Sequence, residues 1–164
     1  MKTVLFLLML SLSHISLSQE LSPNSFDFWI GDWDLTWVNA QGIEMKGTNR
    51  IIKILDGKVI QENFTNLQNG YKGMSLSVFN PRTKIWHQAW TDSNGGYFNF
   101  SGAHEDGYKT FKTDTQKLGD KKIIKRMQFK NITNNSLMWD WEVSEDGGNS
   151  WRLAWRINYK RVNK

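Results

Sequence analysis

Residues 137–159 read LMWDWEVSEDGGNSWRLAWRINY. On both sides of a central turn, large apolar residues alternate with polar ones, as expected of β-strands with one buried face. The two apolar rows are Leu137, Trp139, Trp141 and Val143, then Trp151, Leu153, Trp155, Ile157 and Tyr159. The intervening positions are mostly polar, among them Asp140, Glu142, Arg152, Arg156 and Asn158. The stretch therefore predicts an antiparallel hairpin whose Trp residues, Trp151 included, point inward.

The turn of this hairpin, Ser144–Trp151, reads SEDGGNSW. It fits the pattern S-x-D-x-G-x-[ST]-W, which resembles the Asp-box hairpin of sialidase-type propellers. A propeller repeats the motif over many blades, whereas here it occurs once in a short chain. Gly147 and Gly148 allow positive φ, and Asp146 can accept hydrogen bonds from the turn backbone. We interpret the motif as a structural turn and not as part of a sugar-cleaving site.

The same alternation continues along the rest of the chain. With the hairpin it predicts ten strands, at 32–38, 44–54, 59–65, 71–80, 85–92, 96–104, 108–115, 122–132, 137–143 and 151–159. Turn signals such as Asp56-Gly57 and Asn69-Gly70 separate them. Consecutive strands with one apolar face close most simply into a barrel. We predict an all-β, antiparallel up-and-down barrel of about ten strands, with a β-sandwich as the alternative.

The first residues have the features of an export signal. Lys2 precedes an apolar run at 4–12, and Ser16-Leu17-Ser18 is a small-x-small site before Gln19. We predict a signal peptide at 1–18, a single domain at 19–164, and a secreted or periplasmic location. The chain has no Cys, so it has neither disulfides nor the cysteine of a lipid-anchored lipoprotein.

Charge argues against nucleic acid as a partner. Without Lys2 the chain has 20 Lys and Arg residues against 16 Asp and Glu, a net charge of +4. The basic residues are scattered, whereas nucleic-acid binding needs a concentrated stripe. No segment after the signal is long and apolar enough to anchor the protein in a membrane. A mild preference for anionic ligands is compatible with this charge.

Residues 25–34 read SFDFWIGDWD. This stretch resembles the opening FDFWxGxWD of a family of exported bacterial domains that also carry S-x-DGG-x-[ST]-W near the C-terminus. The resemblance implies a lipocalin-like, calycin-type barrel and assigns no activity. Within it, Gly31-Asp32-Trp33 is similar to the lipocalin G-x-W signature. Haem-binding relatives of this barrel use a His near the last strand; this chain has none there, so no cofactor is expected.

Strand parity predicts how the barrel closes. In lipocalins the Gly of G-x-W permits close approach of the chain and the Trp plugs the base. Arg161 has the parity of Trp155 on the last strand, so it should point inward at the same end as Trp33. We predict that Arg161 packs over the Trp33 ring, with Gly31 beside them, in a cation–π arrangement.

Catalytic and metal-binding patterns are absent from this sequence. After the signal the only His residues are His87 and His104, and neither belongs to a ligand-spaced cluster. No nucleophile elbow or phosphate-binding loop is found. Glu62 and Asp92 form the only inward carboxylate pair that parity offers. No catalytic residue and no metal site are therefore assigned.

The inward row instead predicts a ligand site. Trp37, Trp90, Trp141 and Trp155 would supply stacking surface, while the polar residues Glu62, Gln88 and Arg126 would orient one end of the ligand. Gln88 lies between two inward Trp residues, so its buried amide needs a partner, for which Glu62 and Arg126 are the candidates.

Three functions remain open. One is binding of a small, partly apolar ligand, hydrophobic or an anionic saccharide. A second is a carbohydrate-processing accessory protein or enzyme acting on anionic polysaccharide fragments, since Trp rings stack on sugars. The third is a structural domain in which the rings only fill the barrel.

Overall fold

The computed structural model describes residues 20–162. Apart from a 3-10 turn, η1 (Asp27–Trp29), its regular structure is all strand. The strands are β1 (Gly31–Val38), β2 (Glu44–Ile54), β3 (Val59–Asn66), β4 (Lys72–Asn80), β5 (Ile85–Asp92), β6 (Tyr97–Glu105), β7 (Tyr108–Lys112), β8 (Gln116–Leu118), β9 (Lys121–Lys130), β10 (Ser136–Ser144) and β11 (Arg152–Arg161). The signal peptide predicted at 1–18 lies outside the described residues. Between residues 20 and 162, no helix has the length and apolar character needed to cross a membrane.

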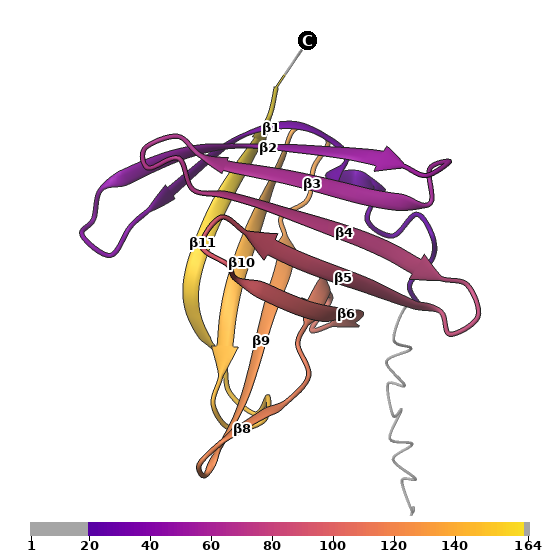
Figure 1. Cartoon of the computed structure of the whole chain (residues 1–164), viewed down its shortest axis with the longest axis vertical. Helices are drawn as coiled ribbons and strands as arrows, with labels where there is room; N and C mark the ends of the chain where they lie inside the picture. Colours follow the sequence, from indigo (N-terminus) through magenta and orange to yellow (C-terminus); the bar gives the residue numbers. More distant parts are fainter. Residues whose placement is uncertain (1–19, 163–164) are drawn as a thin grey trace, which may run out of the picture.

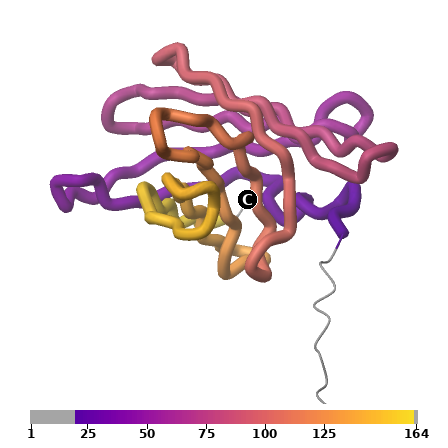
Figure 2. The backbone as a smooth tube through the Cα atoms, turned by 90° about the horizontal axis from the view of Figure 1, so that it is seen from below, coloured from indigo at the N-terminus to yellow at the C-terminus, as the bar shows by residue number. Residues whose placement is uncertain are grey.

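Ten of these strands form a closed antiparallel barrel (Figures 1 and 2). Each strand from β1 to β7 pairs with the next, β7 pairs with β9, and β9, β10 and β11 follow in order. The ring closes where β11 pairs with β1, from Trp33 opposite Arg161 to Thr36 opposite Asn158. The up-and-down barrel predicted from the alternation is therefore confirmed, and the β-sandwich alternative is wrong.

One short strand was not predicted. The strand expected at 108–115 ends at Lys112, and β8 pairs only with β9, outside the barrel wall. All three residues of β8 are exposed, so it has no buried row and no alternation that the sequence could reveal. In Figure 1 this small hairpin extends from the lower end of the barrel.

The segment before β1 fills one end of the barrel. Phe26 and Trp29 are fully buried there, and the Phe26 ring stacks on Phe111 at 4.5 Å. The indole N–H of Trp33 donates to the Trp29 carbonyl at 2.8 Å, and that of Trp86 donates to the Ser22 carbonyl at 2.9 Å. This end is therefore closed by aromatic packing, as expected for the base that Trp33 plugs.

The barrel seam is closed by Arg161. Its guanidinium carbon lies 4.0 Å from the centre of the Trp33 ring, which confirms the predicted cation–π contact. The same guanidinium donates to the carbonyls of Ile30 at 2.6 Å and Phe28 at 3.0 Å. Arg161 thus joins the last strand to the segment that plugs the base.

The inward row predicted for the last strand is wrong before Trp155, at Trp151 and Leu153. Trp141 pairs with Trp155, but the next residue, Glu142, pairs with Leu153, because a bulge shifts the register between them. A bulge of one residue exchanges the two faces of a strand. Leu153 is consequently 45% exposed, and Trp151 packs on the outer face of the barrel against Arg126.

Candidate ligand-binding site

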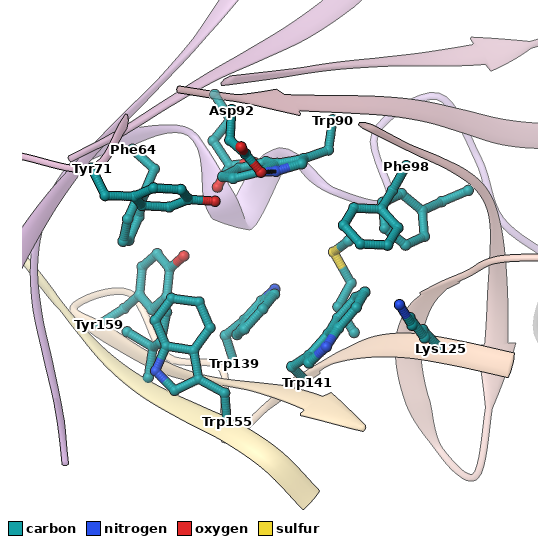
Figure 3. Close-up of a pocket in the computed structure, with 14 residues that line it drawn as sticks. Phe64, Tyr71, Trp90, Asp92, Phe98, Lys125, Trp139, Trp141, Trp155 and Tyr159 are labelled. Atoms are coloured by element: carbon teal, nitrogen blue, oxygen red, sulfur yellow. Dashed lines mark hydrogen bonds between the residues drawn. The ribbon is translucent and has the colours of Figure 1, made fainter. Parts of the chain in front are cut away.

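The barrel encloses a pocket of about 190 Å³. Aromatic side chains from several strands form most of its wall, and Figure 3 shows them around the open space. These rings belong to Phe64, Tyr71, Trp90, Phe98, Phe100, Trp139, Trp141, Trp155 and Tyr159. The aliphatic side chains of Met127 and Ile157 complete the apolar surface. A concave apolar site with few polar groups is the usual form of a small-molecule pocket.

The space exists because one side of the barrel presents small residues inward. On β4 the buried positions are Gly73, Ser75 and Ser77. A Cβ atom on Gly73 would lie 2.0 Å from Cζ2 of Trp90, so the indole of Trp90 lies directly against the β4 backbone. Small residues facing large rings leave room that a uniformly large interior would fill.

A carboxyl group on β3 forms one polar wall of the pocket. Glu62 is 7% exposed and accepts hydrogen bonds from Asn49 Nδ2 and Ser75 Oγ, both at 2.7 Å. Asn49 Nδ2 also donates to the hydroxyl of Tyr159 at 3.1 Å. Burial raises the pKa of Glu62 from 4.5 to about 7, and the two hydrogen bonds only partly oppose this shift. Burial therefore brings the pKa of Glu62 close to neutral pH, against the opposing effect of its two hydrogen-bond donors.

A second carboxylate, Asp92, is committed to its own turn. Its Oδ1 accepts the backbone N–H groups of Asn94 and Gly96, both at 2.9 Å, and its Oδ2 accepts the Trp90 indole N–H at 3.2 Å. Burial opposes ionisation of Asp92, but these donors and the Tyr71 hydroxyl keep its pKa below the usual value. Conversely, burial and then the hydrogen bond to Asp92 raise the pKa of Tyr71 to about 12. Asp92 is thus an ionised anchor that holds Trp90 and Tyr71 in place.

Among residues 20–162, one cationic side chain lines this pocket. Lys125 on β9 is half-buried, and its Nζ lies 4.8 Å from the centre of the Phe98 ring. In Figure 3 it lies beside Trp141, on the opposite side of the pocket from Tyr71 and Tyr159. The pocket therefore has polar groups of different character on two sides, with rings between them.

Four residues of the predicted ligand site line this pocket: Glu62, Trp90, Trp141 and Trp155. Trp37 does not. It lies behind Trp155, with ring centres 5.5 Å apart, and lines a second, more open hollow of about 310 Å³ between the ends of β1 and β11. That hollow forms because β1 and β11 stop pairing after Thr36 and Asn158.

Gln88 is buried but does not line the pocket. Its Nε2 donates to Ser77 Oγ at 2.9 Å, and its Oε1 has no partner among the described residues. The prediction that Gln88 bonds Glu62 and Arg126 is wrong. Ser77 lies opposite Gln88 on β4, and its small side chain lets the Gln88 amide lie within the barrel wall. The position of Gln88 at 1% exposure excludes it from direct ligand contact in this conformation.

Arg126 is on the outer face of the barrel, so its predicted place in the ligand site is wrong. Its guanidinium pairs with Glu142 at 2.7 Å and Asp106 at 3.0 Å and lies 3.9 Å over the Trp151 ring. Strand β9 alternates so that Lys125, Met127 and Phe129 point inward, which leaves Arg126 and Gln128 outside. Arg126 is buried there because Trp151 and the acidic partners cover it.

A neighbouring part of the outer face has a buried ion cluster around Asp140. This carboxylate is fully buried and accepts from Arg156 Nε at 2.6 Å and from Lys130 Nζ at 2.8 Å. Burial opposes its ionisation, but the hydrogen bonds from the two cations hold the pKa of Asp140 below its usual value. Lys130 also reaches Glu142, so this cluster and the Arg126 pair form one network.

Sequence reasoning did not assign the other residues that line the pocket to the site, among them Tyr71, Phe98, Lys125, Trp139 and Tyr159. The alternation predicts that Trp139 and Tyr159 point inward, but it does not show that they reach the ligand site. Phe98 was detectable by the same alternation within 96–104. For Lys125 the sequence holds no signal, because β9 places Lys or Arg on both faces.

No cluster of three His, Asp or Glu residues suited to a metal ion occurs in residues 20–162. Comparison with known proteins adds no assignment, since neither a family model nor a curated protein matches the chain. A functional assignment therefore rests on the geometry of the pocket.

Proposed function

We propose that the protein binds a small, partly apolar ligand non-covalently in the pocket of its barrel. The observation that carries this proposal is the pocket of about 190 Å³ inside the barrel, lined by rings from five different strands and by the buried Glu62 carboxyl. A plain core of this composition would be packed to crystal-like density, with few voids larger than a water molecule. Burial of an apolar ligand there would replace the missing contacts.

The size of the pocket limits the ligand. A dry apolar cavity of roughly 150 Å³ can accept a benzene molecule. A pocket of about 190 Å³ is suited to one substituted ring or a molecule of similar bulk. It is too small for a polysaccharide chain, so an anionic saccharide could enter only as a single small unit.

Binding is favoured over hydrolysis of sugars. Glu62 and Asp92 both line the pocket, as a glycosidase pair would have to. Asp92, however, receives hydrogen bonds at both oxygens from its turn and from Trp90, so it is not free to attack or to move a proton. The arrangement supports a positioning role for Asp92 and no catalytic step.

The test uses the Trp residues as reporters. Titration of small aromatic compounds should change the intrinsic fluorescence, and a bound compound should raise the melting temperature by mass action. Ile157→Phe places additional bulk in the pocket and should weaken binding at least tenfold. Gln88→Leu, which alters a buried residue outside the pocket, should leave the affinity within twofold of wild type.

Equal affinity in Ile157→Phe and wild type would place the site elsewhere. The more open hollow lined by Trp37 and Leu153 would then be the next surface to examine. A stable, folded protein that binds none of the compounds would favour a purely structural barrel.

We further propose that the ligand is met outside the cytoplasm. The support is the export signal expected at 1–18 and the absence of Cys in the chain. Mass spectrometry of the protein recovered from periplasm or medium should show a chain that begins near Gln19. Exported protein that retains Met1 would contradict this proposal.

A further inference from the structure

Lys125 differs from several other buried or half-buried cations of the barrel wall, because among the described residues no carboxylate pairs with it. Arg126 pairs with Glu142, Lys130 with Asp140, and Lys112 with Glu105. The Nζ of Lys125 lies instead over the face of the Phe98 ring. A half-buried ammonium without a counter-ion is costly, and pairing with an anion reduces that cost.

Lys125 lies in the wall of the pocket, so its unpaired ammonium group faces the ligand site. Its strand alternation turns it inward with Met127, and both side chains line the cavity. The carboxylate that shares the pocket, Asp92, is held by Trp90 and by its own turn. Because Asp92 is held there and does not pair with Lys125, the positive charge of Lys125 is available to a ligand.

The other polar wall lies across the barrel. Counting round the ring, five steps lead from β9 to β3 in either direction, through β10, β11, β1 and β2 or through β7, β6, β5 and β4. Lys125 and Glu62 are therefore on opposite walls, and the rings of Trp139, Trp141 and Trp155 line the space between them. A ligand that uses both walls must carry its charge at one end and a neutral polar group at the other.

We propose that the ligand is a small aromatic acid whose carboxylate pairs with Lys125, whose ring stacks among the Trp residues, and whose uncharged polar end faces Glu62. This inference rests on the proposed function and adds the chemical class of the ligand. The pocket volume admits one ring with short substituents, and the charge of Lys125 selects an anion over the matching alcohol.

Three probes separate these features. They are 4-hydroxyphenylacetate, the neutral 2-(4-hydroxyphenyl)ethanol, and phenylacetate, which lacks the hydroxyl. Titrations at low ionic strength, followed through the indole N–H signals in NMR spectra, give both affinity and location. A hydrogen bond to a charged group contributes enough to change affinity about tenfold to a hundredfold. Wild-type protein should therefore bind 4-hydroxyphenylacetate at least tenfold more tightly than the alcohol, and more tightly than phenylacetate.

The variants are Lys125→Met and, as a matched control, Lys109→Met. Lys109 is also half-buried, with its Nζ 5.1 Å from the centre of the Phe28 ring, but it does not line the pocket. Lys125→Met should bring the affinities of the acid and the alcohol to within twofold of each other. Lys109→Met should keep the wild-type preference, which should weaken in both proteins as salt is added.

The outcomes distinguish the two proposals. If acid and alcohol bind wild type equally, or if Lys125→Met keeps the preference, the pocket binds ligands but Lys125 does not select the anion. If none of the probes shifts the pocket indoles, the proposed function fails and this inference fails with it. Shifts confined to Trp151, on the outer face of the barrel, would show an adventitious surface contact and would overturn the inference.

Discussion

Gly31 and Arg161 are so close that no side chain fits between them. A Cβ atom built on Gly31 would lie 2.1 Å from Nη1 of Arg161, the atom that donates to the Ile30 carbonyl. Gly31 also has a φ of +141°, which residues with a side chain rarely adopt. Glycine at residue 31 therefore lets the Arg161 guanidinium reach the Ile30 carbonyl at the seam between the first and last strands.

Replacing Gly31 with Ala should destabilise the barrel through two effects. Backbone strain alone costs about 1–2 kcal/mol, and displacement of Arg161 from Trp33 adds the loss of a cation–π contact of about 0.5–2 kcal/mol. Urea unfolding would measure the sum. Gly70→Ala is the control, because Gly70 has a φ of +71° but nothing within 4 Å of its added Cβ. Similar losses in the two variants would contradict the contribution of Arg161.

Stability should decrease with rising pH because of Glu62. Its pKa is 4.5 in the unfolded chain and about 7 in the fold, so the folded state binds the proton more tightly. The stabilisation is fully present below pH 4.5, declines between pH 4.5 and 7, and is absent above. The change is at most about 3 kcal/mol. Urea unfolding from pH 4.5 to 8 should show this decline in wild type and not in Glu62→Gln. Glu44→Gln, at an exposed position of β2, should retain it.

The outer ion cluster should respond to acid in the opposite direction. The pKa of Asp140 is lowered, so its stabilisation is present above pH 3.8 and is lost as pH falls through the folded value. Asp140→Asn would leave Lys130 and Arg156 without their shared anion. Breaking a buried pair costs about 3–5 kcal/mol, and since the Arg156 side chain is 44% exposed we expect about 2 kcal/mol. Asp34→Asn, on the exposed face of β1, should have little effect; equal losses would show that Asp140 contributes no more than a surface charge.

The SEDGGNSW turn should prove structural. Asp146 Oδ1 accepts the N–H groups of Asn149 and Ser150, both at 3.0 Å, and its Oδ2 accepts the Ser150 hydroxyl at 2.6 Å. Asp146→Ala should speed hydrogen exchange at these two amides and lower the melting temperature, while the affinity for pocket ligands remains unchanged. Asp120→Ala, in the neighbouring β8–β9 turn, serves as control. Loss of ligand binding in Asp146→Ala alone would reopen a functional role for the motif.

The sequence predicted the barrel because its signals are local. Period-two alternation and turn residues specify each strand, and ten strands in succession with one apolar face favour a closed sheet. Counting alternate residues along the last strand was enough to predict the contact of Arg161 with Trp33, because no bulge interrupts β11 between Trp155 and Arg161. Where the alternation is uninterrupted, counting residues is enough to assign a face.

Only the tertiary structure decided which side chains meet in the pocket. The bulge beside Glu142 reverses the face of Leu153 and Trp151, and nothing in the alternating sequence marks it. On β9 both faces carry basic residues, so parity could not place Arg126 outside and Lys125 inside. The space itself depends on the small residues Gly73 and Ser75 of β4, against which the Trp90 ring of the neighbouring strand β5 lies. Local pattern therefore determined the wall of the barrel, whereas packing between distant strands determined what the wall encloses.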